Sequence, residues 1–421
     1  MSETLPQLIE NLAKRARIAS LSLASASTAD KNHALQNIAE GLESNRKLLT
    51  EENQKDLDAA IENGLSEAMI DRLRFTHERI DGMAKGLREL IELPDPVGTV
   101  LEERERPNGL KIKKVRTPIG VIGIIYESRP NVTVDCAGLC LKSGNASILR
   151  GGKEAIHSNQ ALAHIVREAL QNSNLPEDAV QLVPTVDREA LTHLLTLDEY
   201  IHCIIPRGGE GLIRFVSQNS RIPVIKHYKG VCNLFVEEEA DLANAVDIAV
   251  SSKCGRPGVC NAIENLIVSS KIAGEFLPLC AKELIERGCE LRVDSEAAGI
   301  LNDFPTLPAT EDDYAEEFLD LRLAVKVVDS VDEAIAFVNR FGTGHSESIL
   351  TQNKGKAEQF LKEVDASSVY WNASTRYTDG FEFGLGAEIG ISTDRLHARG
   401  PMGLEELCTY KYNIVGTGQW K

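Results

Sequence analysis

Two cysteines with nucleophilic potential, Cys254 and Cys260, stand six positions apart in the 421-residue chain. A thiol attacks as its thiolate, and an unperturbed thiol with a pKa near 8.5 is only about 3% thiolate at neutral pH. Arg256 and Lys253 lie within sequence range of both thiols, and a positive charge nearby favours a thiolate. The apolar run after Cys260, through Val268, predicts a buried strand, so a thiol at the preceding bend is held by the scaffold yet able to face a cleft. The alternative is a cysteine that only fills the core, and spacing alone does not choose between the two thiols.

The amide of Asn131 is a candidate oxyanion donor near the start of a predicted helix. It lies in the segment Tyr126–Thr133, directly after a predicted strand. A positioned donor of this kind contributes roughly 10²–10³ in rate when negative charge develops on a carbonyl oxygen. The alternative is an ordinary helix N-terminus, because proline, here Pro130, is common at the first helical position.

Two glycine-containing turns, Arg150–Lys153 and Arg207–Gly211, follow predicted strands and precede predicted helices. Glycines there let the backbone approach a pyrophosphate while the amides at the helix N-terminus face it. Neither turn carries the G-x-G-x-x-G fingerprint, and either is also compatible with a plain strand–helix connection.

The elements that must position these residues alternate between strand and helix from residue 119 onward. The first round predicts strands at 121–126, 146–149, 180–183, 200–205 and 223–225, and helices at about 133–142, 154–171, 188–196 and 208–217. The second round predicts strands at 233–236, 262–268, 323–328 and 346–350, and helices at 241–251, 271–287, 331–340 and 354–364. This order indicates an α/β protein with two doubly wound domains, a boundary near 226–230, and ligands at the carboxyl ends of the strands. The first hundred residues have the pattern of amphipathic helices that cover a sheet.

Residues 98–117 predict a projecting hairpin. Two charged, β-compatible runs flank Pro107-Asn108-Gly109, and Asn-Gly is a strong hairpin signal because a type I′ turn needs φ > 0 at both central positions. The charged arms indicate that the hairpin lies outside the core. It is either a projecting hairpin without a partner or a dimerisation arm.

Charge and composition argue against several classes of function. The chain carries 46 Lys and Arg against 63 Asp and Glu, and the net charge of −17 argues against nucleic acid as a partner. We expect neither a signal peptide nor a membrane helix, which needs roughly 20 apolar residues. Nine cysteines without a C-x-x-C pair or metal-ligand spacing indicate reduced thiols in a cytoplasmic protein that has no metal site.

Taken together, these segments resemble the aldehyde dehydrogenase superfamily and, within it, the γ-glutamyl phosphate reductases of proline biosynthesis. The most specific pieces are the segments 117–133 and 204–209, the triplet Cys260-Asn261-Ala262, and residues 396–404. The resemblance runs nearly end to end and implies two α/β domains of aldehyde dehydrogenase type with a small β oligomerisation element. It implies a cofactor-binding domain at 1–97 and 118–228, a catalytic domain at 229–395, and oligomerisation elements at 98–117 and 396–421.

The resemblance also implies roles for single residues. Cys260, rather than Cys254, takes the position of the nucleophile, and Asn131 that of the oxyanion amide. The residues implied to bind the cofactor are Gly208 and Gly209 under the pyrophosphate, Glu317 at the nicotinamide ribose, and Arg150 and Lys153 at a 2′-phosphate. The implied cofactor is therefore NADPH or NADP. Arg256 and Arg376 are candidates for binding the substrate.

One departure from the hydrolytic relatives narrows the implied reaction. Those relatives carry a general-base glutamate where this chain has Lys-His-Tyr-Lys-Gly at 226–230. Without that base, water is poorly activated against a thioester, and phosphate fits as the partner of the acyl group. The implied reaction is NADPH-dependent reduction of L-glutamyl 5-phosphate to L-glutamate 5-semialdehyde and phosphate through a thioester on Cys260.

Three other interpretations stay open from the sequence. They are a coenzyme A-acylating aldehyde dehydrogenase of the same fold, a cysteine acyltransferase or hydrolase that needs no nucleotide, and a non-catalytic scaffold. The resemblance further implies a cytoplasmic homo-oligomer and channelling of the substrate from the glutamate kinase that makes it, without nucleic acid or membrane.

Overall fold

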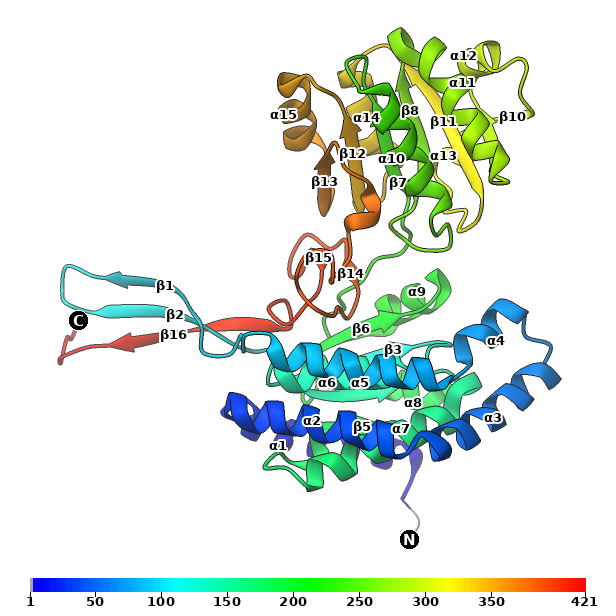
Figure 1. Cartoon of the computed structure of the whole chain (residues 1–421). Helices are drawn as coiled ribbons and strands as arrows, with labels where there is room; N and C mark the ends of the chain where they lie inside the picture. The colour runs from blue at the N-terminus through cyan, green and yellow to red at the C-terminus, as the bar shows by residue number, and fades with distance from the viewer. Residues whose placement is uncertain (1–2) are drawn as a thin grey trace. The chain divides into compact units, whose positions relative to one another are not determined.

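The computed structural model describes residues 3–421, and the contacts divide the chain into two compact units. Unit 1 comprises Met1–Lys226, Gly384–Gly390 and Met402–Lys421, and unit 2 comprises His227–Phe383 and Ile391–Pro401. Figure 1 shows the elements of both units along the chain. That unit 1 binds a cofactor and unit 2 carries the nucleophile stays a prediction.

Unit 1 is built on a four-stranded parallel sheet in the order β5-β4-β3-β6. Its strands are β3 (Val121–Tyr126), β4 (Ala146–Arg150), β5 (Val180–Leu182) and β6 (Cys203–Arg207). The intervening helices are α6 (Val132–Lys142), α7 (Ile156–Gln171), α8 (Arg188–Leu194) and α9 (Glu210–Asn219), with the 3-10 turns η1 (Lys153–Ala155) and η2 (Glu177–Ala179). Every residue of β3 and β4 is buried, as a parallel sheet covered on both faces requires. The alternating order predicted from the sequence is confirmed.

The strand predicted at 223–225 is wrong. Val224 forms only a single bridge with Ile204, flanked by hydrogen bonds from Ile204 N to Pro223 O and from Ile225 N to Ile204 O. Pro223 has no N–H to donate, so the ladder cannot extend through it.

Five helices precede this sheet, as predicted for the first hundred residues. They are α1 (Leu5–Leu23), α2 (Thr28–Ser44), α3 (Arg46–Glu62), α4 (Glu67–Leu73) and α5 (His77–Glu92). The helix α2 packs against both α5 and α7, which links this layer to the helices of the sheet. Among the helices of residues 3–421, none has the combination of length and apolar character that crossing a membrane requires.

Unit 2 is built on a seven-stranded parallel sheet in the order β10-β9-β11-β8-β7-β12-β13. Its strands are β7 (Cys232–Val236), β8 (Ile263–Ser269), β9 (Glu290–Val293), β10 (Thr306–Pro308), β11 (Arg322–Val328), β12 (Ser346–Leu350) and β13 (Ser368–Trp371). Its helices are α10 (Leu242–Cys254), α11 (Ser270–Glu286), α12 (Ser295–Ile300), α13 (Glu311–Tyr314), α14 (Val331–Phe341), α15 (Lys354–Glu363) and the 3-10 turn η3 (Thr375–Tyr377). A two-stranded pair, β14 (Ile391–Ser392) and β15 (Gly400–Pro401), completes the unit.

The sheet of unit 2 separates two apolar cores. In β7, Leu234 and Val236 belong to one core and Phe235 to the other, as the two-residue period of a strand dictates. Every residue of β8 is buried, so the apolar run behind Cys260 is the central strand that the sequence predicts. The short elements β9, β10, β13, α12 and α13 were not predicted, because runs of a few residues carry too little periodicity.

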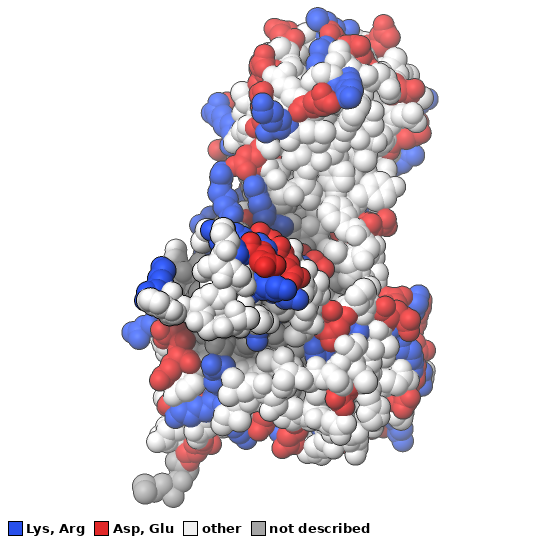
Figure 2. Space-filling model, turned by 90° about the vertical axis from the view of Figure 1, so that its left-hand side faces the viewer, with Lys and Arg blue, Asp and Glu red and all other residues white. Residues whose placement is uncertain are grey.

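A three-stranded antiparallel sheet belongs to unit 1 and runs out from its helices (Figure 1). It contains β1 (Val100–Glu105), β2 (Lys111–Pro118) and β16 (Cys408–Val415) in the order β1-β2-β16. On this sheet, Lys113 of β2 pairs with Glu103 of β1 at 3.3 Å. Figure 2 shows acidic and basic side chains next to one another on the face that it presents. The antiparallel pairing of β1 with β2 confirms the hairpin predicted at 98–117.

The turn of this hairpin differs from the predicted type I′. The N–H of Gly109 donates to the carbonyl of Arg106 at 2.8 Å, so Pro107 and Asn108 are the central residues. Gly109 has φ +84°, whereas Asn108 is not among the residues with positive φ. Proline fixes φ near −65°, which suits the first central position of a type I turn followed by a glycine bulge.

Candidate active site

Cys260 lies in the turn that leads into the amino end of β8. Its side chain is half-buried, and its carbonyl oxygen accepts a hydrogen bond from the Cys232 thiol at 3.2 Å. Burial raises the pKa of Cys232 well above its ordinary value, so this neighbour stays a protonated donor. Because the loop that carries Cys260 precedes β8, the candidate nucleophile lies at the amino ends of the parallel strands and not at their carboxyl ends.

The backbone of Gly230 packs directly against the backbone of Cys260. A Cβ atom built on Gly230 would lie 2.2 Å from the carbonyl oxygen and 2.7 Å from the Cα of Cys260. Only glycine fits at such a distance, and this approach fixes the position of the cysteine from behind. It also means that no side chain can enter the site from residue 230.

Asn261 anchors the same turn to the loop after β13. Its Nδ2 donates to the carbonyls of Thr378 at 2.9 Å and Arg376 at 3.2 Å, and its carbonyl accepts from the Thr375 hydroxyl at 2.7 Å. Asn261 is itself buried. The nucleophile's backbone is therefore held on both sides, by Gly230 and by residues 375–378.

The guanidinium group of Arg376 lies beside the turn that carries the candidate nucleophile. Arg376 is half-buried and donates through Nη1 to Oδ1 of Asn261. Burial lowers the pKa of Arg376, the charge of Arg256 lowers it further, and the charge of Cys260 opposes both. The structure thus brings Arg376 to the turn of Cys260 and leaves Arg256 exposed but close enough for its charge to act on Arg376.

A buried ion pair connects this loop to the segment that contains Glu317. Lys253, in the last turn of α10, pairs with Glu264 of β8, and both side chains are fully buried. Oε1 of Glu264 also accepts the N–H of Leu319 at 3.3 Å. Burial raises the pKa of Glu264 to about 7, against the lowering effect of Lys253, and the charge of Glu317 adds to the rise. Glu317 therefore lies near the loop that carries the nucleophile.

Asn131, in unit 1, is the N-cap residue of α6 but makes no side-chain capping bond. Its Nδ2 donates to Oδ2 of Asp135 at 2.8 Å. Burial raises the pKa of Asp135 to about 6, while the bond from Asn131 lowers it. The helix begins at Val132, so Pro130 precedes the N-cap and does not hold the first helical position that the alternative assumed.

Glu127 occupies the turn between β6 and α9 that was predicted to bind a pyrophosphate. Its Oε2 accepts the N–H of Gly209 at 3.0 Å, and a Cβ atom on Gly208 would lie 2.4 Å from the same oxygen. The N-terminus of α9 thus binds an anionic oxygen, as its dipole and free amides favour. A bound pyrophosphate and the carboxylate of Glu127 would compete for this position.

The cations predicted for a 2′-phosphate lie at the end of β4. Arg150 is buried, donates through Nη2 to the carbonyl of Val186 at 3.1 Å, and its Nε has no hydrogen-bond partner among the described residues. Burial lowers the pKa of Arg150, the charge of Glu154 opposes this, and the charge of Arg188 lowers the pKa further. Lys153 begins η1 and is exposed. A buried guanidinium with an unused N–H fits a phosphate group.

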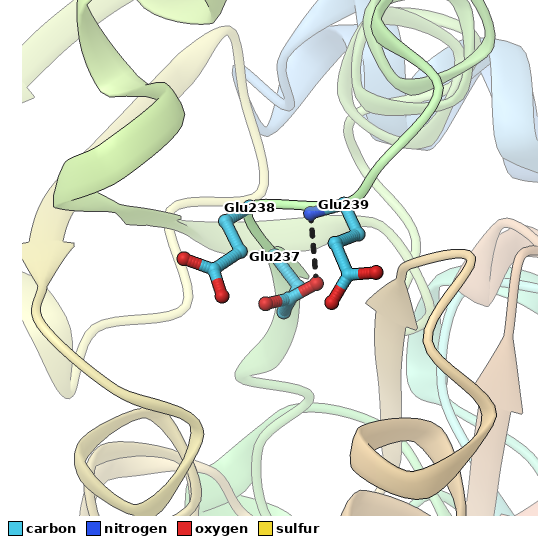
Figure 3. A group of neighbouring side chains, drawn as sticks. All are labelled: Glu237, Glu238 and Glu239. Atoms are coloured by element: carbon cyan, nitrogen blue, oxygen red, sulfur yellow. Dashed lines mark hydrogen bonds between the residues drawn. The ribbon is translucent and has the colours of Figure 1, made fainter.

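Within residues 3–421, three adjacent carboxylates at the end of β7, Glu237, Glu238 and Glu239, form a group whose oxygens lie close enough to share a cation (Figure 3). The N–H of Glu239 donates to Oε2 of Glu237 at 2.9 Å. Lys356 pairs with Glu237 and Glu238 at 2.5 Å each, and Lys271 pairs with Glu238 at 2.5 Å. The lysines already compensate these charges, and we assign no metal role to the group.

Several residues of the site escaped the prediction from sequence. Gly230, Glu127 and Arg188 acquire their roles through contacts with residues far away in the chain. Lys253, expected from the sequence as a cation near the thiols, pairs instead with Glu264, eleven residues away, and both side chains are buried. A lysine at the end of an apolar helix and a glutamate inside an apolar strand were the signals available for this pair.

Comparisons with known proteins place these features in a family. Residues 3–297 and 322–411 match the model of the aldehyde dehydrogenase family. The chain is 57% identical over 422 residues to the γ-glutamyl phosphate reductase of Opitutus terrae. The aligned region covers 100% of this chain and 99% of that protein. The crystal structure of the γ-glutamyl phosphate reductase of Thermotoga maritima superposes with a TM-score of 0.96 at 49% identity, covering 98% of this chain and 99% of that one. The crystal structure of an acetylating aldehyde dehydrogenase from Geobacillus thermoglucosidasius shares the fold, with a TM-score of 0.70 at 15% identity. The alignment covers 99% of this chain and 98% of that one.

Proposed function

The chain belongs to the aldehyde dehydrogenase family and within it to the γ-glutamyl phosphate reductases, and on this premise we propose how its residues carry out the reaction. The reaction is the reduction of L-glutamyl 5-phosphate to L-glutamate 5-semialdehyde in proline biosynthesis. The observation that carries the residue assignment is the half-buried thiol of Cys260 in the turn to which Arg376 bonds through Asn261, with the charge of Arg256 near Arg376.

Cys260 is the nucleophile that attacks the acyl carbon. Its thiolate forms the C–S bond while negative charge develops on the carbonyl oxygen, which the amide of Asn131 stabilises. The amide nitrogen of Asn131 has two N–H groups, and Asp135 accepts one of them. The C–O bond to phosphate then breaks, phosphate leaves, and a thioester remains on Cys260.

Arg256 and Arg376 bind the anionic parts of the substrate. Both the phosphate and the carboxylate of glutamyl phosphate are anions, and guanidinium groups bind such groups through paired N–H donors. The bond from Arg376 to Asn261 orients that guanidinium next to the nucleophile's turn.

NADPH is the proposed cofactor, and when bound it supplies the hydride that reduces the thioester to the aldehyde level. Gly208 and Gly209 provide the turn for the pyrophosphate, Glu317 binds the nicotinamide ribose, and Arg150 with Lys153 binds the 2′-phosphate. The free N–H of the buried Arg150 supports the last assignment.

Phosphate rather than water or coenzyme A is the partner of the acyl group. The stretch 226–230 contains no carboxylate to activate water, and the backbone contact at Gly230 admits no side chain. In the oxidative direction, phosphate should therefore support reduction of NADP by the semialdehyde, whereas coenzyme A should not. Activity with coenzyme A alone would favour the acylating alternative.

Two cysteine variants test the assignment of the nucleophile. Cys260→Ala should abolish phosphate-dependent oxidation of the semialdehyde, because the proposed thioester forms on the sulfur that this change removes. Cys254→Ala, the matched control, should keep most of the activity. The reverse pattern would show that the wrong thiol was chosen.

The antiparallel sheet is the proposed site of homo-oligomer formation. The strand β16 is an edge strand, and Tyr410, Tyr412 and Ile414 along it are 48%, 51% and 60% exposed. An apolar row on an open edge is suited to pairing with a second copy of the chain. Ile414→Glu should therefore shift sedimentation toward the monomer, and an unchanged sedimentation coefficient would exclude this face.

The substrate links the protein to a kinase. An acyl phosphate hydrolyses in water, so direct transfer from the glutamate kinase that makes it would protect it, and we propose such channelling in the cytoplasm. The nine free thiols fit a reducing compartment. Co-sedimentation of the two enzymes, with and without substrate, checks the association.

A further inference from the structure

Cys254 has no part in the proposed reaction, yet its surroundings are those of a reactive thiol. It ends α10, is half-buried, and lines a cavity of about 310 Å³. The cavity is also lined by Arg287, at the end of α11, and by Asp247, Ser251 and Glu283. A small molecule can therefore reach this sulfur without entering the core.

A second thiol, that of Cys289 in the turn between α11 and β9, belongs to the apolar core against which Cys254 packs. The turn is closed by hydrogen bonds from Gly288 N to the carbonyl of Ile285 at 2.8 Å and from Cys289 N to the carbonyl of Leu284 at 3.0 Å. Gly288 has φ +80°, as the left-handed residue after a helix requires. This geometry turns Cys289 into the apolar core, where it is buried.

The electrostatic environment makes the two thiols unequal. A hydrogen bond from Cys289 and the nearby charges of Arg287 and Lys253 lower the pKa of Cys254 to about 7, against the effect of burial. The same hydrogen bond and burial raise the pKa of Cys289. Cys254 is therefore the thiol of the two that loses its proton more readily, and the thiolate is the form that reacts.

We propose that Cys254 and Cys289 form a peroxide-sensitive thiol pair that closes to an intramolecular disulfide. The sulfur of the Cys254 thiolate attacks one oxygen of hydrogen peroxide, the O–O bond breaks, hydroxide leaves, and a sulfenic acid forms. The sulfur of Cys289 then attacks the sulfenic sulfur, the S–S bond forms, the S–O bond breaks, and water leaves with the thiol proton. Two thiols lose two electrons in total, and peroxide is reduced to two molecules of water.

The disulfide would join the end of α10 to the turn after α11. Cys254 is the last helical residue before the loop that carries Cys260, so the bond fixes the start of that loop. Cys280, from α11, lies in the same core and is close enough for the charge of Cys254 to raise its pKa. It has no access to the cavity and serves as an internal control.

Peptide mapping of the full-length Cys260→Ser variant tests the proposal, because the nucleophile can then not compete for peroxide. After treatment with hydrogen peroxide, alkylation under denaturing conditions and digestion with trypsin, the three thiols separate into Cys254–Lys271, Ile272–Lys282 and Gly288–Arg292. The bond after Arg256 is followed by Pro257 and stays uncut. We expect a cross-link between Cys254–Lys271 and Gly288–Arg292 that dithiothreitol reverses, while Cys280 remains alkylated.

A second variant separates the two chemical steps. With Cys289→Ala added, dimedone should trap the sulfenic acid on Cys254, and no cross-link should form. The proposal is wrong if peroxide leaves Cys254 as fully alkylated as Cys280 in the Cys260→Ser protein, or if Cys254 cross-links to Cys280 instead. The mapping of the Cys260→Ser protein decides the matter even where the double variant does not fold.

Discussion

Gly230→Ala should inactivate the enzyme by displacing the backbone of Cys260. The new Cβ would lie 2.2 Å from the carbonyl oxygen of Cys260, so the two segments must separate by about 1.2 Å before the contact reaches the 3.4 Å of an ordinary neighbour. A misplacement of about 1 Å costs roughly 10²-fold in rate when reacting atoms must be held in a near-attack geometry. The expected loss is therefore about a hundredfold in kcat, without contact between residue 230 and the substrate.

The assay is the phosphate-dependent oxidation of glutamate 5-semialdehyde, followed by the formation of NADPH. Gly274→Ala in α11 is the matched control, because nothing lies within 4 Å of its Cβ position and φ is helical. The control should keep full activity and gain about 0.5–1 kcal/mol of stability, since alanine replaces glycine inside a helix. Thermal melts of both proteins establish that they are folded. A folded Gly230→Ala protein with activity within threefold of the parent would refute the reasoning.

Three further changes test other parts of the site. Lys253→Met should lower the free energy of unfolding in urea by about 3–5 kcal/mol, because it leaves Glu264 buried without its partner. The control Lys271→Met, which breaks an exposed ion pair, should lower it by about 1 kcal/mol or less. Equal losses in the two variants would contradict the assignment of Lys253 and Glu264 as a buried ion pair. The folded pKa of Glu264, about 7, is above its unfolded value of 4.5, so its contribution to stability is present below pH 4.5 and is lost as the pH rises toward 7. Glu264→Gln should remove that slope from unfolding free energies measured between pH 5 and 8, and an unchanged slope would assign it to other groups. Lys153→Glu should raise the KM for NADPH by about tenfold or more and leave the KM for NADH nearly unchanged, since only NADPH has the 2′-phosphate; equal changes would exclude the role.

The sequence predicted most of the fold because the governing signals are local. The βαβ order of unit 1 and the central strand behind Cys260 follow from periodicity within about ten residues. The turn at Pro107–Gly109 shows the limit of this approach. The Asn-Gly signal predicted a hairpin correctly, but the preceding proline changed which residues are central and so the turn type.

The sequence by itself determined the order of the elements, the family resemblance, and a short set of candidate residues with Cys254 and Cys260 unresolved by spacing. Tertiary structure decided what surrounds each thiol. Arg376 reaches Asn261 across 115 positions, and Gly230 meets Cys260 by the packing of two loops. Such contacts depend on how strands are ordered in a sheet, which no local pattern encodes. The same packing brings Arg376 to the turn of Cys260 and places Cys254 at a cavity, so the two neighbouring cysteines have different surroundings.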